Sequence, residues 1–169
     1  IFENIWIQPA AGDAGGALGA ALAYWHLDLD KKRNEVNKDT MQGSYLGGDF
    51  SDTEIENKLN EIGARFDILN ENEIIERTTN DLSNGKAIGW FQGRMEFGPR
   101  ALGNRSIIAD PRSKTMQKNL NLKVKFRESF RPFAPSILIE DVSNWFELTT
   151  ESPYMLLVSD VKKELQIKM

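Results

Sequence analysis

The sequence GWFQGRMEFGPRALGNRSIIADPR, residues 89–112, holds the most informative pattern in the chain. An apolar run typical of a strand leads into a loop that contains Gly93, Gly98 and Gly103. Three arginines are spaced through this loop: Arg94, Arg100 and Arg105. Glycines let backbone N–H groups approach an anion, and a guanidinium can bind phosphate oxygens through two parallel hydrogen bonds. The Walker and dinucleotide-binding spacings are both missing. The pattern therefore predicts a strand followed by a phosphate-binding loop of another kind.

A second basic cluster follows in KVKFRESFRPFAPS, residues 123–136. Lys123, Lys125 and Arg127 occupy alternating positions, so an extended segment would project all three to one side. From residue 86 to residue 131 there are eleven Lys or Arg against three Asp or Glu, a balance of +8, whereas the whole chain carries −4. Such a local charge suits a small phosphorylated ligand better than a long polyanion, although a solvated basic face also explains it.

Composition excludes several kinds of site. The chain of 169 residues is 40% hydrophobic, a globular composition that allows one domain, or one domain plus the edge of another. It has no cysteine, and His26 is its single histidine, so a metal would need ligands from elsewhere. There is no apolar run long enough to span a bilayer and no signal-peptide pattern. We therefore expect a soluble, cytoplasmic protein without membrane partners.

The N-terminal part predicts a strand at residues 1–8, ended by Pro9, and then a helix with Asp13 as its N-cap. This helix is rich in small residues, including Gly15, Gly16 and Gly19, each of which costs about 1 kcal/mol relative to alanine inside a helix. Two interpretations remain open. Either another backbone packs against the small face, or a phosphate lies over the helix N-terminus.

Helices and short apolar strands alternate after residue 50. The sequence predicts a helix from Ser51, with a capping box to Glu54 and an end at Gly63. A second helix starts near Asn70 or Asn72 and ends at Asn84. Strands are expected at residues 86–92, 106–109 and 134–139, and a helix capped by Ser113 with Met116 and Leu120 on one face lies between the last two. This alternation favours an α/β domain.

The string 89–112, followed by the K-F-R-E-S-F-R-P-F-A-P-S element, resembles the C-terminal domain of carbamoyltransferases of the nodulation-protein-U and antibiotic O-carbamoyltransferase type. The segment QPAAGDAGGALGAAL, residues 8–22, is similar to the end of that family's N-terminal domain. The resemblance implies the edge of an actin-like transfer domain at residues 1–30 and a linker at 31–50. It also implies a YrdC-like domain at 51–169, with a mixed sheet and helices.

The resemblance implies an enzyme that forms carbamoyl adenylate from ATP and carbamoyl phosphate and passes the carbamoyl group to a hydroxyl acceptor. Arg100 and Lys125 match residues that bind the nucleotide and carbamoyl phosphate, and Asp13 matches an aspartate at the metal site of the transfer domain. The implied cofactors are ATP with Mg²⁺ and a divalent metal, iron, in the transfer domain. Further candidates for phosphate binding complete the set: Arg94, Arg105, Ser106 and Arg127. Arg94, Arg105 and Ser106 have an equally open structural interpretation, as ion-pair or capping residues.

Two departures from the family pattern limit what the chain is expected to do. The family's later nucleotide-binding motifs and its upstream histidine ligands are missing, so the sequence looks truncated at both ends and is expected to be inactive without the remaining part of its polypeptide. The alternatives are an RNA- or nucleotide-binding module without transfer activity, or a purely structural interaction domain. The negative net charge and the lack of a stacked aromatic platform count against RNA.

Overall fold

The computed structural model describes residues 5–34 and 39–167, which fold into two compact units. The first unit consists of Ile1–Gly47, Met95–Leu102 and Ser136–Met169. The second unit consists of Gly48–Arg94 and Gly103–Pro135. The predicted boundaries at residues 30 and 50 stay a prediction, because compact units are not the same as independently folding domains.

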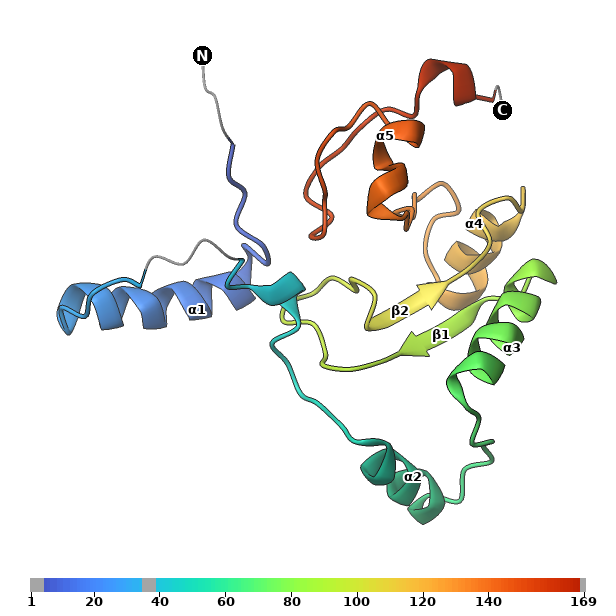
Figure 1. The fold of residues 1–169 in the computed structure, drawn as a ribbon, viewed down its shortest axis with the longest axis horizontal. Helices are drawn as coiled ribbons and strands as arrows, with labels where there is room; N and C mark the ends of the chain where they lie inside the picture. The colour runs from blue at the N-terminus through green and yellow to red at the C-terminus, as the bar shows by residue number, and fades with distance from the viewer. Residues whose placement is uncertain (1–4, 35–38, 168–169) are drawn as a thin grey trace. The chain divides into compact units, whose positions relative to one another are not determined.

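The described residues form an α/β structure with five α-helices and one small antiparallel sheet (Figure 1). In the first unit the helical elements are α1 (Asp13–Ala23), η1 (Tyr24–Asp28), η2 (Gln42–Ser44), η4 (Ile139–Asp141), α5 (Val142–Trp145) and η5 (Lys163–Leu165). The second unit contains α2 (Asp52–Glu61), α3 (Glu71–Ser83), β1 (Ile88–Phe91), β2 (Arg105–Ile108), α4 (Met116–Asn119) and η3 (Leu120–Val124). None of these helices is long and apolar enough to cross a bilayer.

Both predicted helices after residue 50 are confirmed, and each begins with a capping box. Ser51 Oγ accepts a hydrogen bond from the Glu54 N–H, while the Glu54 carboxylate accepts one from the Ser51 N–H. Asn70 and Glu73 make the same reciprocal pair at the start of α3. Gly63 follows α2 with φ +66°, a left-handed conformation that favours glycine. Local sequence therefore determines both helix starts.

The sheet of the described residues has two strands, β1 and β2, which pair antiparallel with Phe91 opposite Arg105. Along β1 half-buried residues alternate with exposed ones, so this apolar run is not a fully buried strand. The predicted strand at residues 134–139 is wrong, because no strand forms there and η4 begins at Ile139. Pro132 and Pro135 each lack an N–H donor and fix φ, which disfavours a ladder in this segment.

The helix predicted before residue 120 forms as α4 and continues as η3. Met116 and Leu120 are both buried, as their shared face predicts. The predicted cap at Ser113 is wrong, because the helix begins after Thr115 and no side chain caps it. The next residue, Asn121, is fully buried, and its amide organises the chain that follows.

In the first unit, α1 begins at Asp13 but Gly12 is its N-cap, and no side chain caps the helix. The prediction of Asp13 as N-cap is therefore wrong. The carboxylate lies in the first turn instead, where the helix dipole favours a negative charge. The strand predicted at residues 1–8 does not form at residues 5–8, and residues 1–4 lie outside the described part.

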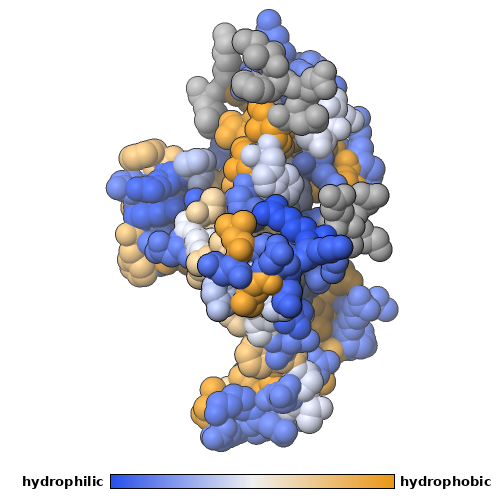
Figure 2. Space-filling model, turned by 90° about the vertical axis from the view of Figure 1, so that its left-hand side faces the viewer, coloured by the Kyte–Doolittle hydropathy of each residue, from blue (hydrophilic) through white to orange (hydrophobic). Residues whose placement is uncertain are grey.

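Few apolar side chains are buried in the described residues: Pro9, Met41, Met116 and Leu120. Figure 2 shows hydrophobic residues scattered among hydrophilic ones on the visible surface. The accessible surface is 14422 Å². Two separate folded units of half the chain's mass would expose about 10,000 Å². Little apolar surface is therefore buried within either unit.

We predict that Asn121→Ala lowers the free energy of unfolding by about 2 to 4 kcal/mol, because the fully buried amide makes three hydrogen bonds that are all lost. Arg127 Nε loses its acceptor and the Ser129 carbonyl loses its donor, while the Arg131 carbonyl keeps only the bond from Gln117. Asn119→Ala is the matched control, since Asn119 is exposed in α4, and it should stay within about 0.5 kcal/mol. Urea unfolding of the two variants measures the difference. Equal midpoints would contradict the role given to Asn121.

Candidate functional site

Residues 95–102, MEFGPRAL, form a loop that carries Arg100 and is held at its start by residues 44–47. The Gly47 N–H donates to the Met95 carbonyl at 2.9 Å, and the Phe97 N–H donates to the Ser44 carbonyl at 2.6 Å. Ser44 is almost fully buried, with 1% exposure. These main-chain bonds fix where the loop begins.

The end of the same loop is fixed at Leu102. The Tyr45 hydroxyl donates to the Leu102 carbonyl at 2.7 Å, and the Leu102 N–H donates to Glu96 Oε1 at 2.7 Å. Glu96 is buried, with 4% exposure. Both polar groups of the Leu102 main chain are therefore bound, one by another segment and one within the loop.

Two glycines allow the close approaches on which this loop depends. A Cβ at Gly47 would lie 2.8 Å from the Met95 carbonyl oxygen. Gly98 has φ +101°, and a Cβ there would lie 2.6 Å from Cβ of Ala10. Any side chain at either position would push the loop away from its supports.

Arg100 lies between the two fixed ends of the loop and is exposed. Among the described residues it takes part in no ion pair and no side-chain hydrogen bond, so its guanidinium has no anionic partner of its own there. Asp13 belongs to the same unit and is also exposed. Within residues 5–34 and 39–167 no cluster of three His, Cys, Asp or Glu could hold a metal. Asp13 thus offers a single carboxylate, and any further ligands would have to come from outside the described residues.

The turn that supports the loop is itself held by Tyr154. The Tyr154 hydroxyl donates to the Asp39 carboxylate and accepts a hydrogen bond from the Gly43 N–H at 3.0 Å. The hydrogen bond from Tyr154 is the main cause that lowers the pKa of Asp39, with smaller contributions from the N–H groups of Met41 and Gly43. Burial, followed by the bond to Asp39, raises the pKa of Tyr154 to about 12.

The K-F-R segment lies in the second unit and is not extended, so the prediction that Lys123, Lys125 and Arg127 project to one side of an extended segment is wrong. Lys123 lies within η3, and the Lys125 N–H donates to the Leu120 carbonyl at 2.9 Å. Phe126 then takes φ +49°, which reverses the chain after the helix. Helical hydrogen bonding therefore continues through the region where the alternation of charges favours a strand.

Asn121 holds the rest of this segment. The Arg127 N–H donates to the Asn121 carbonyl at 2.9 Å, and Arg127 Nε donates to Asn121 Oδ1 at 2.6 Å. The Arg127 guanidinium also lies 4.9 Å from the centre of the Phe133 ring, a cation–π distance. Lys125 is exposed, and no ion pair within the described residues involves it. The segment therefore presents a lysine from a fixed backbone.

The remaining candidates lie around the turn between β1 and β2. Asn104 Nδ2 donates to the Arg94 carbonyl at 2.7 Å, and the Gly103 N–H donates to Ser106 Oγ at 3.0 Å. The Ser106 hydroxyl therefore has a main-chain partner just before β2, and its role in phosphate binding stays a prediction. Arg105 is half-buried within β2.

The structure assigns the candidates to different units. The second unit contains five of them: Arg94, Arg105, Ser106, Lys125 and Arg127. Arg100 and Asp13 belong to the first. The two residues predicted to be catalytic, Arg100 and Lys125, are thus supported by separate sets of contacts.

Residues 79–169 match a family model described as the carbamoyltransferase C-terminus. The matched range includes the Arg100 loop and the K-F-R segment. The chain belongs to the carbamoyltransferase family. This confirms the resemblance that the sequence motifs indicate.

Individual relatives extend the similarity to the rest of the chain. Nodulation protein NolO of Bradyrhizobium diazoefficiens is 46% identical over 96% of the chain and 30% of its own length. The 3′-hydroxymethylcephem-O-carbamoyltransferase of Streptomyces clavuligerus is 30% identical over 99% of the chain and 29% of its own length. An uncharacterized protein of Synechocystis sp. is 55% identical over 99% of the chain and 28% of its own length. The chain therefore spans less than a third of the length of these relatives.

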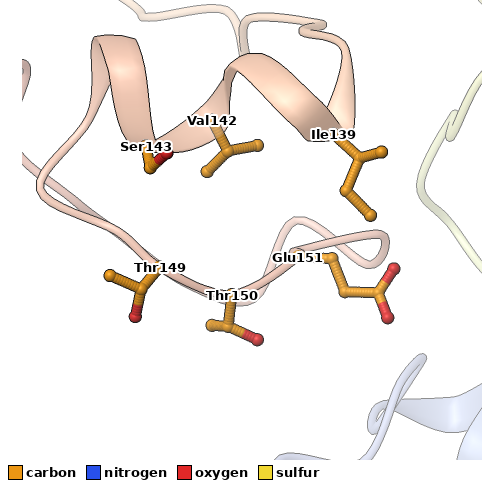
Figure 3. A pocket seen from close by; sticks show the side chains of 6 residues that line it. All are labelled: Ile139, Val142, Ser143, Thr149, Thr150 and Glu151. Atoms are coloured by element: carbon orange, nitrogen blue, oxygen red, sulfur yellow. The ribbon is translucent and has the colours of Figure 1, made fainter.

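A hollow of about 320 Å³ lies in the first unit of this family member, between η4, α5 and the following loop (Figure 3). Ile139, Val142 and Ser143 line its helical side. Thr149, Thr150 and Glu151 line the loop side. No lysine or arginine lines it and Glu151 makes it anionic, so it does not suit a phosphate.

Sequence reasoning missed the residues that hold the cationic segments in place: Tyr45, Glu96, Asn121 and Tyr154. Tyr45 lies in the stretch interpreted as a linker, and nothing in its neighbours indicates a long-range hydrogen bond. The burial of Asn121 could have been predicted, because Asn121 directly follows Leu120, a residue on the buried face of a helix. A polar residue at such a position is buried only when its amide is hydrogen bonded.

We predict that Tyr154→Phe lowers the melting temperature by a few degrees at pH 7 and that this difference shrinks in acid. The pKa of Asp39 in the folded state lies below its usual 3.8, so the stabilisation is present above about pH 4 and is lost as pH falls through the folded pKa. Melting curves of parent and variant between pH 2 and pH 7, roughly the carboxylate range, measure this.

Asp39→Ala should lose this hydrogen bond as well, and the double variant should lower the melting temperature by less than the sum of the two single changes, because both remove the same hydrogen bond. A difference between parent and variant that stays constant down to the lowest pH would show that the carboxylate is not the partner that matters.

Proposed function

We propose that this chain supplies phosphate-binding residues to an enzyme that forms carbamoyl adenylate from ATP and carbamoyl phosphate and transfers the carbamoyl group to a hydroxyl. Family membership supports the carbamoyl chemistry. The observation that carries the proposal concerns two exposed cations, Arg100 and Lys125. Neither has an acidic partner among the described residues, and buried polar groups hold the backbone on which each of them lies.

The chemistry needs such cations. When an oxygen of the carbamate group attacks the α-phosphorus of ATP, pyrophosphate leaves with its negative charge. Atom balance requires that a water molecule is consumed and that phosphate from carbamoyl phosphate is released as well. Fixed arginine and lysine side chains neutralise the developing charge without a proton transfer. In the second step the acceptor oxygen attacks the carbamoyl carbon and AMP leaves.

We further propose the finer architecture that the resemblance implies. Residues 51–169 would belong to a YrdC-like domain with a larger mixed sheet, to which β1 and β2 contribute. Residues 1–30 would be the edge of an actin-like transfer domain, with a linker at 31–50. Arg94, Arg105, Ser106 and Arg127 would support phosphate binding as secondary contacts. ATP with Mg²⁺, carbamoyl phosphate and a hydroxyl acceptor would be its small-molecule partners, and the cytoplasm its location.

The proposal predicts that the protein translated from the complete open reading frame releases pyrophosphate only when ATP and carbamoyl phosphate are both present. Arg100→Ala or Lys125→Ala should slow this release about 30- to 1000-fold, a loss of about 2 to 4 kcal/mol of transition-state stabilisation. Lys118→Ala is the matched control, since Lys118 is an exposed cation in α4, and it should change the rate less than twofold, roughly the assay error for a surface residue. Activity of both site variants within about threefold of the parent would refute the assignment.

Asp13 tests the transfer domain separately. Asp13 does not cap α1 with its side chain, so Asp13→Asn should cost little stability beyond the weak dipole term of about 0.3 to 1 kcal/mol. As a metal ligand it needs its negative charge, so the variant should lose bound metal and acceptor carbamoylation while pyrophosphate release continues. Elemental analysis and the two half-reactions measure this, with Asp28→Asn as the control. Full metal content with normal transfer in Asp13→Asn would leave Asp13 without a functional role.

A further inference from the structure

Arg100 is an exposed functional candidate of the first unit, and its position depends on how residues 95–102 are held. The start of the loop is fixed by main-chain bonds to Ser44 and Gly47. These bonds use main-chain groups only, although the close approach to Met95 requires that position 47 carries no side chain. The other end depends on side chains, because Leu102 is held by Tyr45 and Glu96.

Tyr45 is the residue that ties this far end to another segment. Its hydroxyl reaches the Leu102 carbonyl, two residues after Arg100, at 2.7 Å. The tyrosine ring is held in turn by Gly43, where a Cβ would lie 2.8 Å from Cε2 of the ring. Gly43 has φ +71°, so the position suits glycine for its backbone as well as for its space.

The geometry points to Tyr45 as a positioning residue for Arg100, and this inference rests on the proposed role of Arg100 in binding phosphate. Tyr45 is not a catalytic residue in this account, because its hydroxyl is used on the Leu102 carbonyl. Its hydrogen bond limits the freedom of the loop in which Arg100 lies. A guanidinium that is already placed loses less conformational freedom when it binds an anion, and the affinity rises accordingly.

The test compares Tyr45→Phe in two backgrounds of the protein translated from the complete open reading frame. Tyr45→Phe keeps the ring and removes the donor. We expect kcat/KM for ATP in pyrophosphate release to fall about tenfold in the parent, the value of a lost hydrogen bond. In the Arg100→Ala background the same change should alter kcat/KM by less than about twofold, because Tyr45 has no arginine left to place. A merely structural role would lower both backgrounds equally.

Two further variants complete the design. Tyr24→Phe is the matched control, since Tyr24 is 59% exposed in η1, and it should leave kcat/KM unchanged. Gly43→Ala keeps the hydroxyl but displaces the ring, so it should reproduce the loss that depends on Arg100 even if Tyr45→Phe folds poorly. Hydrogen exchange of the amides from Phe97 to Leu102 should also be faster in Tyr45→Phe.

The outcomes separate this inference from the proposed function. If Arg100→Ala is impaired but Tyr45→Phe and Gly43→Ala are as active as the parent, the positioning role of Tyr45 is wrong and the function of Arg100 stands. An equal loss in both backgrounds also overturns the positioning role. If Arg100→Ala itself is fully active, the phosphate-binding role of Arg100 and the inference built on it are both wrong.

Discussion

The hydrogen bonds between residues 44–47 and the loop 95–102 are the constraint on which the first unit depends. Ordering the backbone of each loop residue costs about 1 to 2 kcal/mol, whereas one hydrogen bond contributes about 0.5 to 1.5 kcal/mol net. No single bond can therefore order the loop. The bonds at Met95, Phe97 and Leu102 have to act together. Because so few apolar side chains are buried, packing contributes less to this order than it does in most domains.

In the second unit, the side-chain amide of Asn121 orders the segment that carries the cations. The Asn121 side chain accepts from Arg127 and donates to the carbonyls of Ser129 and Arg131 at 3.2 and 2.8 Å. In both units the exposed cations lie on segments whose shape is determined by buried polar groups. Those polar groups have their own partners within the protein, so they influence ligand binding only through the backbone that they hold.

Contacts between residues close in the sequence could be predicted from it, and contacts between distant residues could not. The capping boxes at Ser51 and Asn70 join residues three apart, so their sequence signal is complete. The alternating charges at Lys123 and Lys125 are equally local, but there the helix from Met116 continues and its hydrogen bonds override the alternation. The bonds from Tyr45 to Leu102 and from Gly43 to Tyr154 join residues 57 and 111 apart. No spacing rule covers such pairs, whereas the glycine and arginine pattern of residues 89–112 already indicated the Arg100 loop.

The contact between Gly98 and Ala10 has a consequence for sequence variation. Ala10 has φ +52°, an unusual conformation for alanine, and its Cβ fills the space that a side chain at position 98 would need. A larger residue at either position would press on the other. In an alignment of the family, the two columns should therefore stay small together or change together. The segment before α1 and the arginine loop would then evolve as one coupled pair, although 88 positions separate them in the chain.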